Sequence, residues 1–169
     1  MMIEIRKAEK NEIQQFISLL HQVKEEMEHP EWFALDPDEV VINLFEQGRM
    51  KIWLAMDRDV VAGAFSIVVP NLEEYNLGYE LNMNNEQLMR VVHMDAAAVR
   101  QQYRGQGLQK RLMQEAEQEI REIPNRILLC TVHPDNFASL NNLLKQDYSK
   151  MKLLNKYDSI RYIMKKELL

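Results

Sequence analysis

Two glycines stand close together in a basic stretch of the chain, between two apolar segments. Gly105 and Gly107 follow an apolar run that ends at Val99, and an apolar stripe of helical spacing begins at Leu108. Glycine lets the backbone approach a ligand closely, and the first turn of a helix presents unpaired N–H groups and the positive end of its dipole. The pattern therefore predicts a site for a phosphate or pyrophosphate group.

The charges around this turn reverse the sign of the chain as a whole. Four basic residues and no acidic one lie between Arg100 and Arg111, whereas the formal net charge is −5. A solvated helix face would also explain the basic residues, and a Gly-x-Gly pair alone often only makes a turn. A dinucleotide-binding turn is set aside, because Lys110 stands where its third glycine would be.

Two side chains suited to acid–base chemistry precede the turn on the predicted strand 91–99. His93 and Asp95 are two residues apart and so share a face of that strand. An alkyl amine is almost fully protonated at pH 7 and needs a base, and a histidine with an ordinary pKa near 6.5 can serve as one. The alternative is a hydrogen-bonded core histidine with Asp95 as its partner. No other histidine stands at ligand spacing with this pair, so we expect no metal.

Length and composition limit the class of protein. The chain has 169 residues, of which 46% are hydrophobic and 28% charged, and this predicts a single domain over residues 1–169. Its acidity argues against a nucleic-acid partner. No apolar run approaches the roughly 20 residues of a membrane span, so no membrane partner is expected either. A single cysteine, Cys130, and no signal-peptide pattern predict a cytoplasmic protein.

The remaining pattern outlines a mixed sheet with helices. β-forming runs predict strands at 3–8, 51–56, 60–69, 91–99, 126–132, 151–154 and 160–164. Helices are expected to begin at caps formed by Asn11 and Asp36, after the two glycines, and over 136–146. The polar stretch 70–87 is expected to be a long loop, of the kind that is usually functional or mobile.

Two segments resemble a known family. Residues 102–107 (Gln-Tyr-Arg-Gly-Gln-Gly) are similar to the Gln/Arg-x-x-Gly-x-Gly/Ala signature of the GCN5-related N-acetyltransferases, the GNAT family. Residues 132–139 resemble the place where the family has a strand, a proline and an asparagine that opens a helix. The resemblance implies an α/β fold: a mixed, mostly antiparallel sheet with a V-shaped splay between two central parallel strands, flanked by helices.

The resemblance also implies acetyl-CoA as cosubstrate and an amine, of a small molecule or a peptide, as acceptor, with direct attack in a ternary complex. The protein itself is expected to be a monomer or homodimer. The backbone amides that would hold the pyrophosphate belong to Arg104, Gly105, Gln106, Gly107, Leu108 and Gln109. Ala98 and Val99 would pair with the pantetheine arm like an added strand. Asn136 would contact the cofactor. Ser139 and Asn142 lie at helical spacing from it and are further candidates, with plain helix surface as the alternative.

The family resemblance places chemistry on the strand 91–99. In the family this strand lies against the reacting thioester, and some members carry a catalytic Glu at the position of His93, so His93 and Asp95 are the expected catalytic residues. The tyrosine that often protonates the leaving thiolate is replaced by Leu143. This replacement leaves an alternative open, a catalytically weak CoA-binding sensor or interaction module.

The acceptor would bind among residues of segments 28–36 and 70–87. The candidates are Trp32, Phe33, Tyr79 and Glu80. Aromatic rings and carboxylates together favour a cationic amine, through cation–π and charge attraction. The alternative is a solvated acidic loop with Trp32 packed on the core.

Overall fold

The structure is a computed structural model that describes residues 2–169. Strands, α-helices and 3-10 helices (η) follow in this chain order: β1 (Glu4–Lys7), η1 (Lys10–Glu12), α1 (Ile13–Glu26), η2 (Pro30–Trp32), α2 (Asp38–Glu46), β2 (Met50–Asp57), β3 (Val60–Val68), η3 (Leu77–Leu81), α3 (Asn85–Arg90), β4 (Val91–Val99), η4 (Gln101–Tyr103), α4 (Leu108–Ile120), β5 (Ile127–Val132), α5 (Phe137–Lys145), β6 (Ser149–Lys156) and β7 (Ser159–Glu167).

The strands hydrogen-bond in the order β1-β2-β3-β4-β5-β7-β6. The β1–β2, β2–β3, β5–β7 and β6–β7 pairs are antiparallel, whereas β4 and β5 run parallel. This confirms the predicted mixed, mostly antiparallel sheet with helices. The chain folds as two compact units, and β4 contributes to both. The prediction of a single domain stays a prediction.

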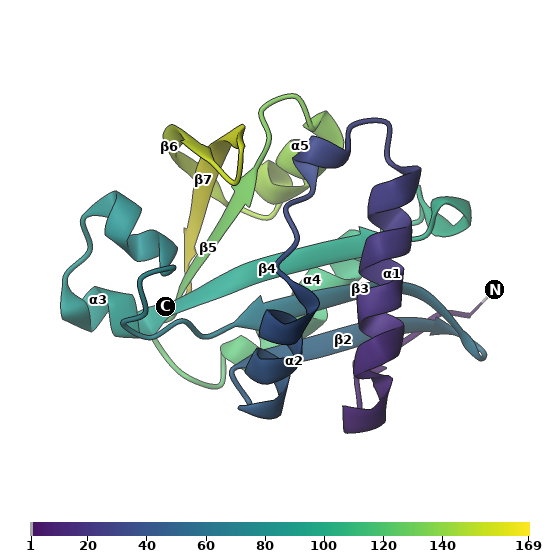
Figure 1. Ribbon diagram of the computed structural model, residues 1–169. Helices are drawn as coiled ribbons and strands as arrows, with labels where there is room; N and C mark the ends of the chain where they lie inside the picture. The colour runs from purple at the N-terminus through teal and green to yellow at the C-terminus, as the bar shows by residue number, and fades with distance from the viewer. Residues whose placement is uncertain (1) are drawn as a thin grey trace. The chain divides into compact units, whose positions relative to one another are not determined.

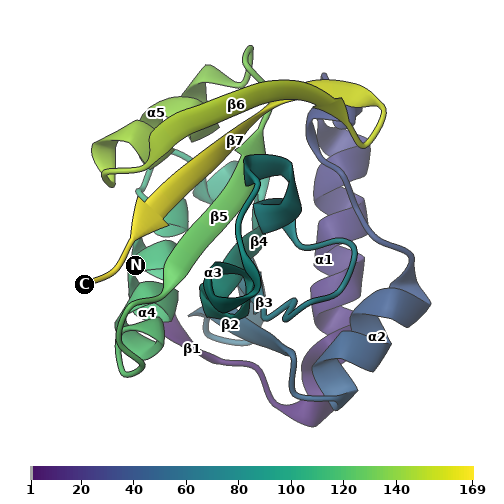
Figure 2. The same ribbon diagram turned by 90° about the vertical axis from the view of Figure 1, so that its left-hand side faces the viewer.

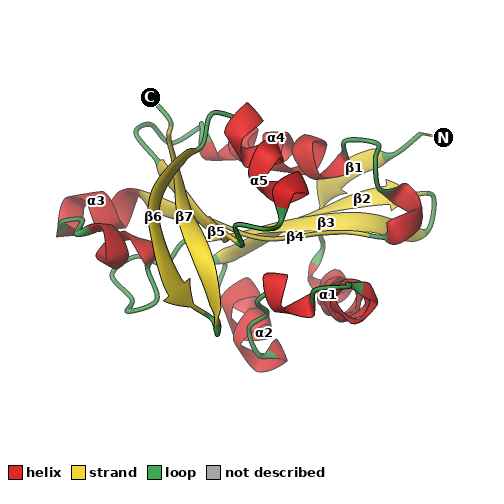
Figure 3. Cartoon of the chain, turned by 90° about the horizontal axis from the view of Figure 1, so that it is seen from above, coloured by secondary structure: helices red, strands yellow, loops and turns green. Residues whose placement is uncertain are grey.

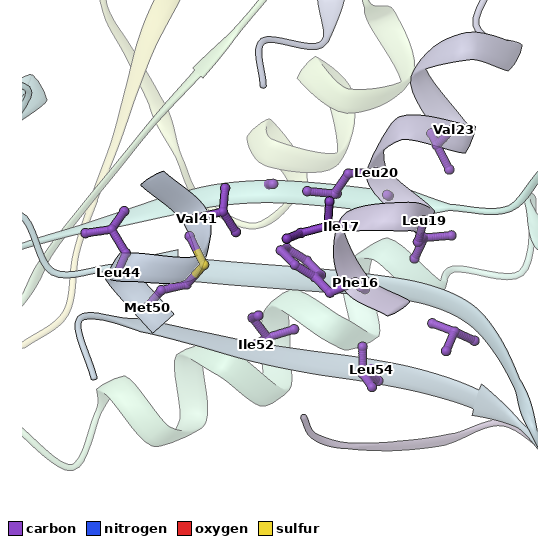
Figure 4. Packing of buried hydrophobic residues seen from close by; sticks show 14 of the residues in the cluster. Phe16, Ile17, Leu19, Leu20, Val23, Val41, Leu44, Met50, Ile52 and Leu54 are labelled. Carbon is purple, nitrogen blue, oxygen red and sulfur yellow. The ribbon is translucent and has the colours of Figure 1, made fainter. Parts of the chain in front are cut away.

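The N-terminal unit consists of the residues up to Val68 together with Asp95–Ile120. Helices α1 and α2 lie on one face of β2 and β3, and α4 lies on the other (Figures 1 and 3). Apolar residues of α1 recur every three or four positions, which places Phe16 and Leu20 on the face turned toward the sheet. There they pack with Val41 of α2 and Ile52 of β2 (Figure 4).

The C-terminal unit consists of Val69–Met94 and Arg121–Leu169. In it β5, β7 and β6 lie side by side (Figure 2). Its small core packs η3 against the strands through Leu77, Val91, Ile127, Leu129 and Ile163. The parallel pairing joins residues 91–93 of β4 to 127–129 of β5 and ends there. Met94 continues β4 and Cys130 continues β5 within the same unit, so the two strands stop pairing before they leave this unit.

Two predicted helix starts are wrong. Asn11 lies inside η1, because Arg6 binds both carboxylate oxygens of Glu12 at 2.8 Å and Glu12 accepts the Glu9 N–H at 2.8 Å. These contacts set a 3-10 turn before α1. Helix α2 begins at Asp38 with Pro37 as its N-cap, so Asp36 caps nothing. A residue that precedes proline is sterically kept out of the helical region.

The stretch 70–87 is not the long loop that its polarity predicts. It contains η3 and the start of α3. The side chain of Asn76 accepts the Gly78 N–H at 2.8 Å, and Asn84 and Gln87 form a reciprocal capping box. Short helices whose ends are satisfied in this way need no long apolar stripe, which explains why periodicity did not find them.

No helix within residues 2–169 is long and apolar enough to cross a membrane.

Candidate functional site

The 3-10 helix η4, which follows β4, is held at both of its ends by hydrogen bonds within the N-terminal unit. The backbone N–H of Arg100 donates to the Ala62 oxygen at 2.9 Å, and its Nε donates to the Val61 oxygen at 2.7 Å. The hydroxyl of Tyr103 donates to Asp57 Oδ2 at 2.6 Å. These bonds tie η4 to the β2–β3 hairpin, so the turn that follows starts from a fixed position.

The turn itself has the conformation that glycine permits. Gly105 has φ of +80° and Gly107 has φ of +74°, in the left-handed region that L-residues avoid. Residues 104–107 are exposed, whereas Leu108 is buried and fixes the first turn of α4. The first N–H groups of α4 have no partner within the helix and face an exposed turn. The predicted pyrophosphate site therefore has a suitable backbone, and the use of the amides of residues 104–109 stays a prediction.

The residues predicted to line the pantetheine arm lie in the same unit. Ala98 is buried in the core cluster, and Val99 is half-buried. The Val99 oxygen accepts a hydrogen bond from Arg104 Nε at 3.1 Å. A ligand pairing with this oxygen would share it with Arg104. The pairing of Ala98 and Val99 with pantetheine stays a prediction.

A recess opens between α1, α2, β2 and the second half of β4. It is open to solvent, and its enclosed volume is about 20 Å³. Its walls are apolar and come from Phe16, Ile17, Leu20, Leu35, Val41 and Met50. Its polar lining is formed by His21, Asp36, Asp38 and Asp95. Proteins bind small ligands where apolar walls combine with a few polar groups, and the lining of this recess has that combination.

Asp95 lines this recess, and its pKa is shifted from the ordinary value of an aspartate. Burial among protein atoms, together with the nearby charge of Asp36, raises its pKa to about 7. By solvent accessibility Asp95 is nevertheless an exposed residue, because its carboxylate faces the open recess, and this contact with solvent weakens the effect of burial on its pKa. Ser66 Oγ donates to Asp95 Oδ2 at 3.3 Å and accepts the Ala96 N–H at 3.3 Å. A carboxylate with a pKa near neutrality is suited to take up a proton at physiological pH.

Asp36 is a recess residue that the sequence assigned to another role. Burial raises the pKa of its carboxyl, and its charge contributes to the raised pKa of Asp95. It is free to face the recess because Pro37, and not Asp36, caps α2. The sequence signal that could have pointed to this role is the pair of acids, Asp36 and Asp38, on either side of Pro37.

His93 has contacts that differ from those of Asp95. The imidazole is 7% exposed, and its Nε2 accepts the backbone N–H of Leu77 at 3.0 Å. Burial, with a smaller effect from Lys156, lowers the pKa of His93 to about 4. The ring of Tyr75 lies edge-on, with centroids 6.2 Å apart. One ring nitrogen is thus already engaged, and the contacts favour a structural histidine over a base. Catalysis by His93 stays a prediction.

Replacing His93 with alanine is expected to lower the free energy of unfolding by about 1–3 kcal/mol, since the buried Leu77 N–H loses its acceptor. The folded-state pKa of His93 lies below the ordinary 6.5. Its contribution is therefore complete above about pH 6.5 and is lost as the pH falls toward 4. Urea unfolding at pH 7.5 and 5 should show a smaller pH difference for His93→Gln than for the wild type. A variant with wild-type stability and a turnover lowered by 10² or more would instead restore His93 as the base.

The predicted acceptor residues fall in different places. In the N-terminal unit, Trp32 stacks on His29 with ring centroids 4.4 Å apart, and Phe33 packs against the core. In the C-terminal unit, the hydroxyl of Tyr79 donates to the Leu72 oxygen at 2.7 Å. Glu80 binds Lys156 at 3.4 Å and lies 3.8 Å from Lys152. Each has a structural contact, and none of the four lines the recess. Their role in acceptor binding stays a prediction.

The polar residues predicted from the second motif belong to α5 in the C-terminal unit. Asn136 caps the helix, with its Oδ1 accepting the Ser139 N–H at 3.4 Å. Asn142 Oδ1 accepts from Gln146 Nε2 at 2.9 Å. Leu143 is buried, and its hydrocarbon side chain has no proton to donate. The cofactor contacts of Asn136, Ser139 and Asn142 stay predictions. No group of three or more metal-ligating side chains occurs within residues 2–169.

Comparison with known proteins agrees with the motif and the fold. A model of the acetyltransferase (GNAT) family matches residues 17–148. A comparison with curated protein sequences gives no significant match.

Solved structures of similar fold span nearly the whole chain. The structure of yncA from Salmonella typhimurium with its cofactor acetyl-CoA has a TM-score of 0.75 at 13% identity and covers 99% of this chain and 95% of that one. A ribosomal-protein-alanine N-acetyltransferase from Brucella melitensis has a TM-score of 0.73 at 17% identity, with 98% and 99% covered. The paia N-acetyltransferase from Thermoplasma acidophilum in complex with coenzyme A has a TM-score of 0.71 at 14% identity, with 99% of each chain covered. At these identities the likeness shows the fold.

Proposed function

The chain belongs to the acetyltransferase (GNAT) family, and from this membership we propose that it transfers the acetyl group of acetyl-CoA to a small amine. The observation that carries the proposal is the exposed turn at Gly105 and Gly107, held between η4 and the buried start of α4. Backbone amides in this conformation suit a pyrophosphate, which is the charged centre of the donor.

The residues of this turn would hold the donor through backbone groups. The amides of residues 104–109 would donate to the pyrophosphate oxygens, and the dipole of α4 favours negative charge at its N-terminus. Arg104 and Lys110 are exposed cationic side chains beside the turn. The chain's own contribution to donor binding is therefore a preformed backbone with added positive charge.

Asp95 would perform the proton transfer that amine acetylation requires. The acceptor enters as an ammonium and cannot attack until it loses a proton. With a pKa near 7, a substantial fraction of Asp95 is ionised at neutral pH and can take that proton. The freed nitrogen then attacks the thioester carbonyl carbon, gives its second proton to solvent water, and the carbon–sulfur bond breaks to release CoA as the thiolate.

Cys130 supports direct attack over a covalent enzyme intermediate. Burial raises the pKa of its thiol to about 12, and the residue is 7% exposed within β5. A thiol in such a state is a poor nucleophile, because the thiolate is the reactive form. The amine itself therefore remains the better candidate to attack the thioester. We also propose a cytoplasmic location and a monomer or homodimer, in line with the sequence.

A thiol-release assay tests this function. Wild-type protein is incubated with acetyl-CoA and a panel of primary amines, and free CoA thiol is measured with and without each amine. We expect release that depends on the amine and saturates with it. Tight acetyl-CoA binding by calorimetry, without thiol release in the presence of any amine, would favour the CoA-binding sensor. The buried Leu143, in place of a proton-donating tyrosine, is the reason for this alternative.

A further inference from the structure

Two carboxylates face the recess without a cation of the protein to balance them. Asp36 precedes α2 and Asp95 lies on β4, and both belong to the N-terminal unit. Among the residues that the structure describes, Asp36 is the charged group that perturbs the pKa of Asp95, and it raises that pKa. Within residues 2–169, no cation offsets this repulsion. A bound cation would relieve it, whereas like charges held together in a partly desolvated site are unfavourable.

The other charged groups at the recess do not supply that cation. His21 of α1 and Asp38 of α2 also line it, and His21 Nε2 lies 2.7 Å from Asp38 Oδ1. Both side chains are about half exposed, at 52% and 54%. His21 is therefore already paired with Asp38 at the solvent-facing side. The interior of the recess keeps an excess of negative charge.

The walls restrict what else the ligand can be. Phe16 and Leu20 of α1 and Val41 of α2 present hydrocarbon to the recess. A peptide backbone placed against them would leave N–H and C=O groups without partners, at a cost of roughly 1–3 kcal/mol each. A chain of methylene groups has no such groups. The enclosed part of the recess is also narrow, at about 20 Å³, so only a slender chain can lie along its open side.

We propose that Asp36 determines the acceptor: it receives the ammonium group of a small aliphatic primary amine, whose carbon chain lies on the apolar walls of the recess. This inference rests on the proposed acetyltransferase function. An ammonium has three N–H donors, so it can bind Asp36 and Asp95 together. When Asp95 takes one proton, Asp36 still holds the amine by another. Asp36 is thus the specificity and positioning residue beside the base.

The test compares Asp36→Asn with the wild type, using n-butylamine as acceptor. The KM for n-butylamine is expected to rise about 10- to 100-fold, which is the loss of one hydrogen bond to a charged group. The KM for acetyl-CoA should stay unchanged. The ascending limb of kcat/KM against pH should also move to lower pH, because removing the negative charge of Asp36 lowers the pKa of Asp95. The matched control is Glu39→Gln, an exposed acid on α2 outside the recess, which should behave as wild type.

A second measurement does not depend on turnover. Calorimetric titration of the wild type with n-butylammonium should show binding that is weakened in Asp36→Asn, whereas 1-butanol, which lacks the charge, should bind neither protein. An unchanged KM for n-butylamine in Asp36→Asn, or a peptide N-terminus acetylated more efficiently than n-butylamine, would overturn the inference and leave the acetyltransferase function standing. Thiol release with no amine at all would overturn the function and the inference together.

Discussion

Replacing Asp95 with asparagine is expected to lower kcat by about 10²–10⁴-fold at pH 7, the range for loss of a general base. Asparagine keeps the size of the side chain and can still accept from Ser66, but it cannot take a proton. The ascending limb of the pH profile near 7 should disappear, and the remaining rate should follow the fraction of free amine. Steady-state kinetics between pH 6 and 10 would measure both effects.

Asp59→Asn is the matched control for this variant, because Asp59 is exposed at the β2–β3 turn. It should keep wild-type kinetics. Affinity for acetyl-CoA should be similar in all three proteins. If Asp95→Asn keeps the wild-type rate and its limb near pH 7, Asp95 is not the base, and the recess loses its assigned chemistry.

Replacing Gly105 with glutamate should abolish measurable acetyl-CoA binding in a folded protein. A Cβ at Gly105 would meet nothing within 4 Å, so the variant has no steric clash to relieve. Its φ of +80° adds a backbone cost of about 1–2 kcal/mol for an L-residue. The carboxylate would repel the pyrophosphate, and a shifted backbone would misdirect several charged hydrogen bonds of about 1.5–3 kcal/mol each. Calorimetry should show a Kd raised by at least about 100-fold.

Gly48→Glu separates backbone strain from the loss of the site. Gly48 has φ of +73°, and a Cβ there also meets nothing within 4 Å, but it follows α2 and lies away from the turn. The two variants should lose similar stability in urea unfolding, while Gly48→Glu keeps wild-type affinity for acetyl-CoA. Equal affinities in both variants would remove the pyrophosphate from this turn.

The donor side of the site could be predicted from the sequence because its determinants are local. Strand 91–99, the two glycines and the helix that starts at Leu108 are adjacent in the chain, and the structure has β4 and α4 with these same starts. Positive φ at Gly105 and Gly107 follows from the residue type. Features that depend only on neighbouring residues can be predicted without knowledge of the tertiary fold.

The recess could not be predicted, because it is assembled from segments distant in sequence. Phe16 lies on α1, Val41 on α2 and Met50 on β2, and only packing brings them to one recess. Asp36 matched the sequence pattern of a helix cap, and the conformation forced by Pro37 changes that outcome. Perturbed pKa values arise from such packing, so the sequence could propose Asp95 but could not give its pKa.

His93 and Asp95 illustrate why strand alternation alone misleads. Both were expected to act together, since residues two apart share a face. The structure gives each its own partners: His93 contacts Leu77 and Tyr75 of the C-terminal unit, and Asp95 contacts Ser66 of the N-terminal unit. Their burial shifts the two pKa values in opposite directions, because it disfavours the charged form of each. Contacts, and not sequence spacing, therefore separate Asp95, the base proposed here, from His93, whose catalytic role stays a prediction.

The central claim, acetyl transfer from acetyl-CoA to a small amine, is tested most directly by mass spectrometry of the acceptor. Wild-type protein is incubated with n-butylamine and acetyl-CoA that carries an isotopically labelled acetyl group. The account predicts labelled N-butylacetamide, with one CoA thiol released for each amide formed, and a rate that falls sharply in Asp95→Asn. Labelled acetate accompanied by unmodified amine, across a panel of primary amines, would contradict it.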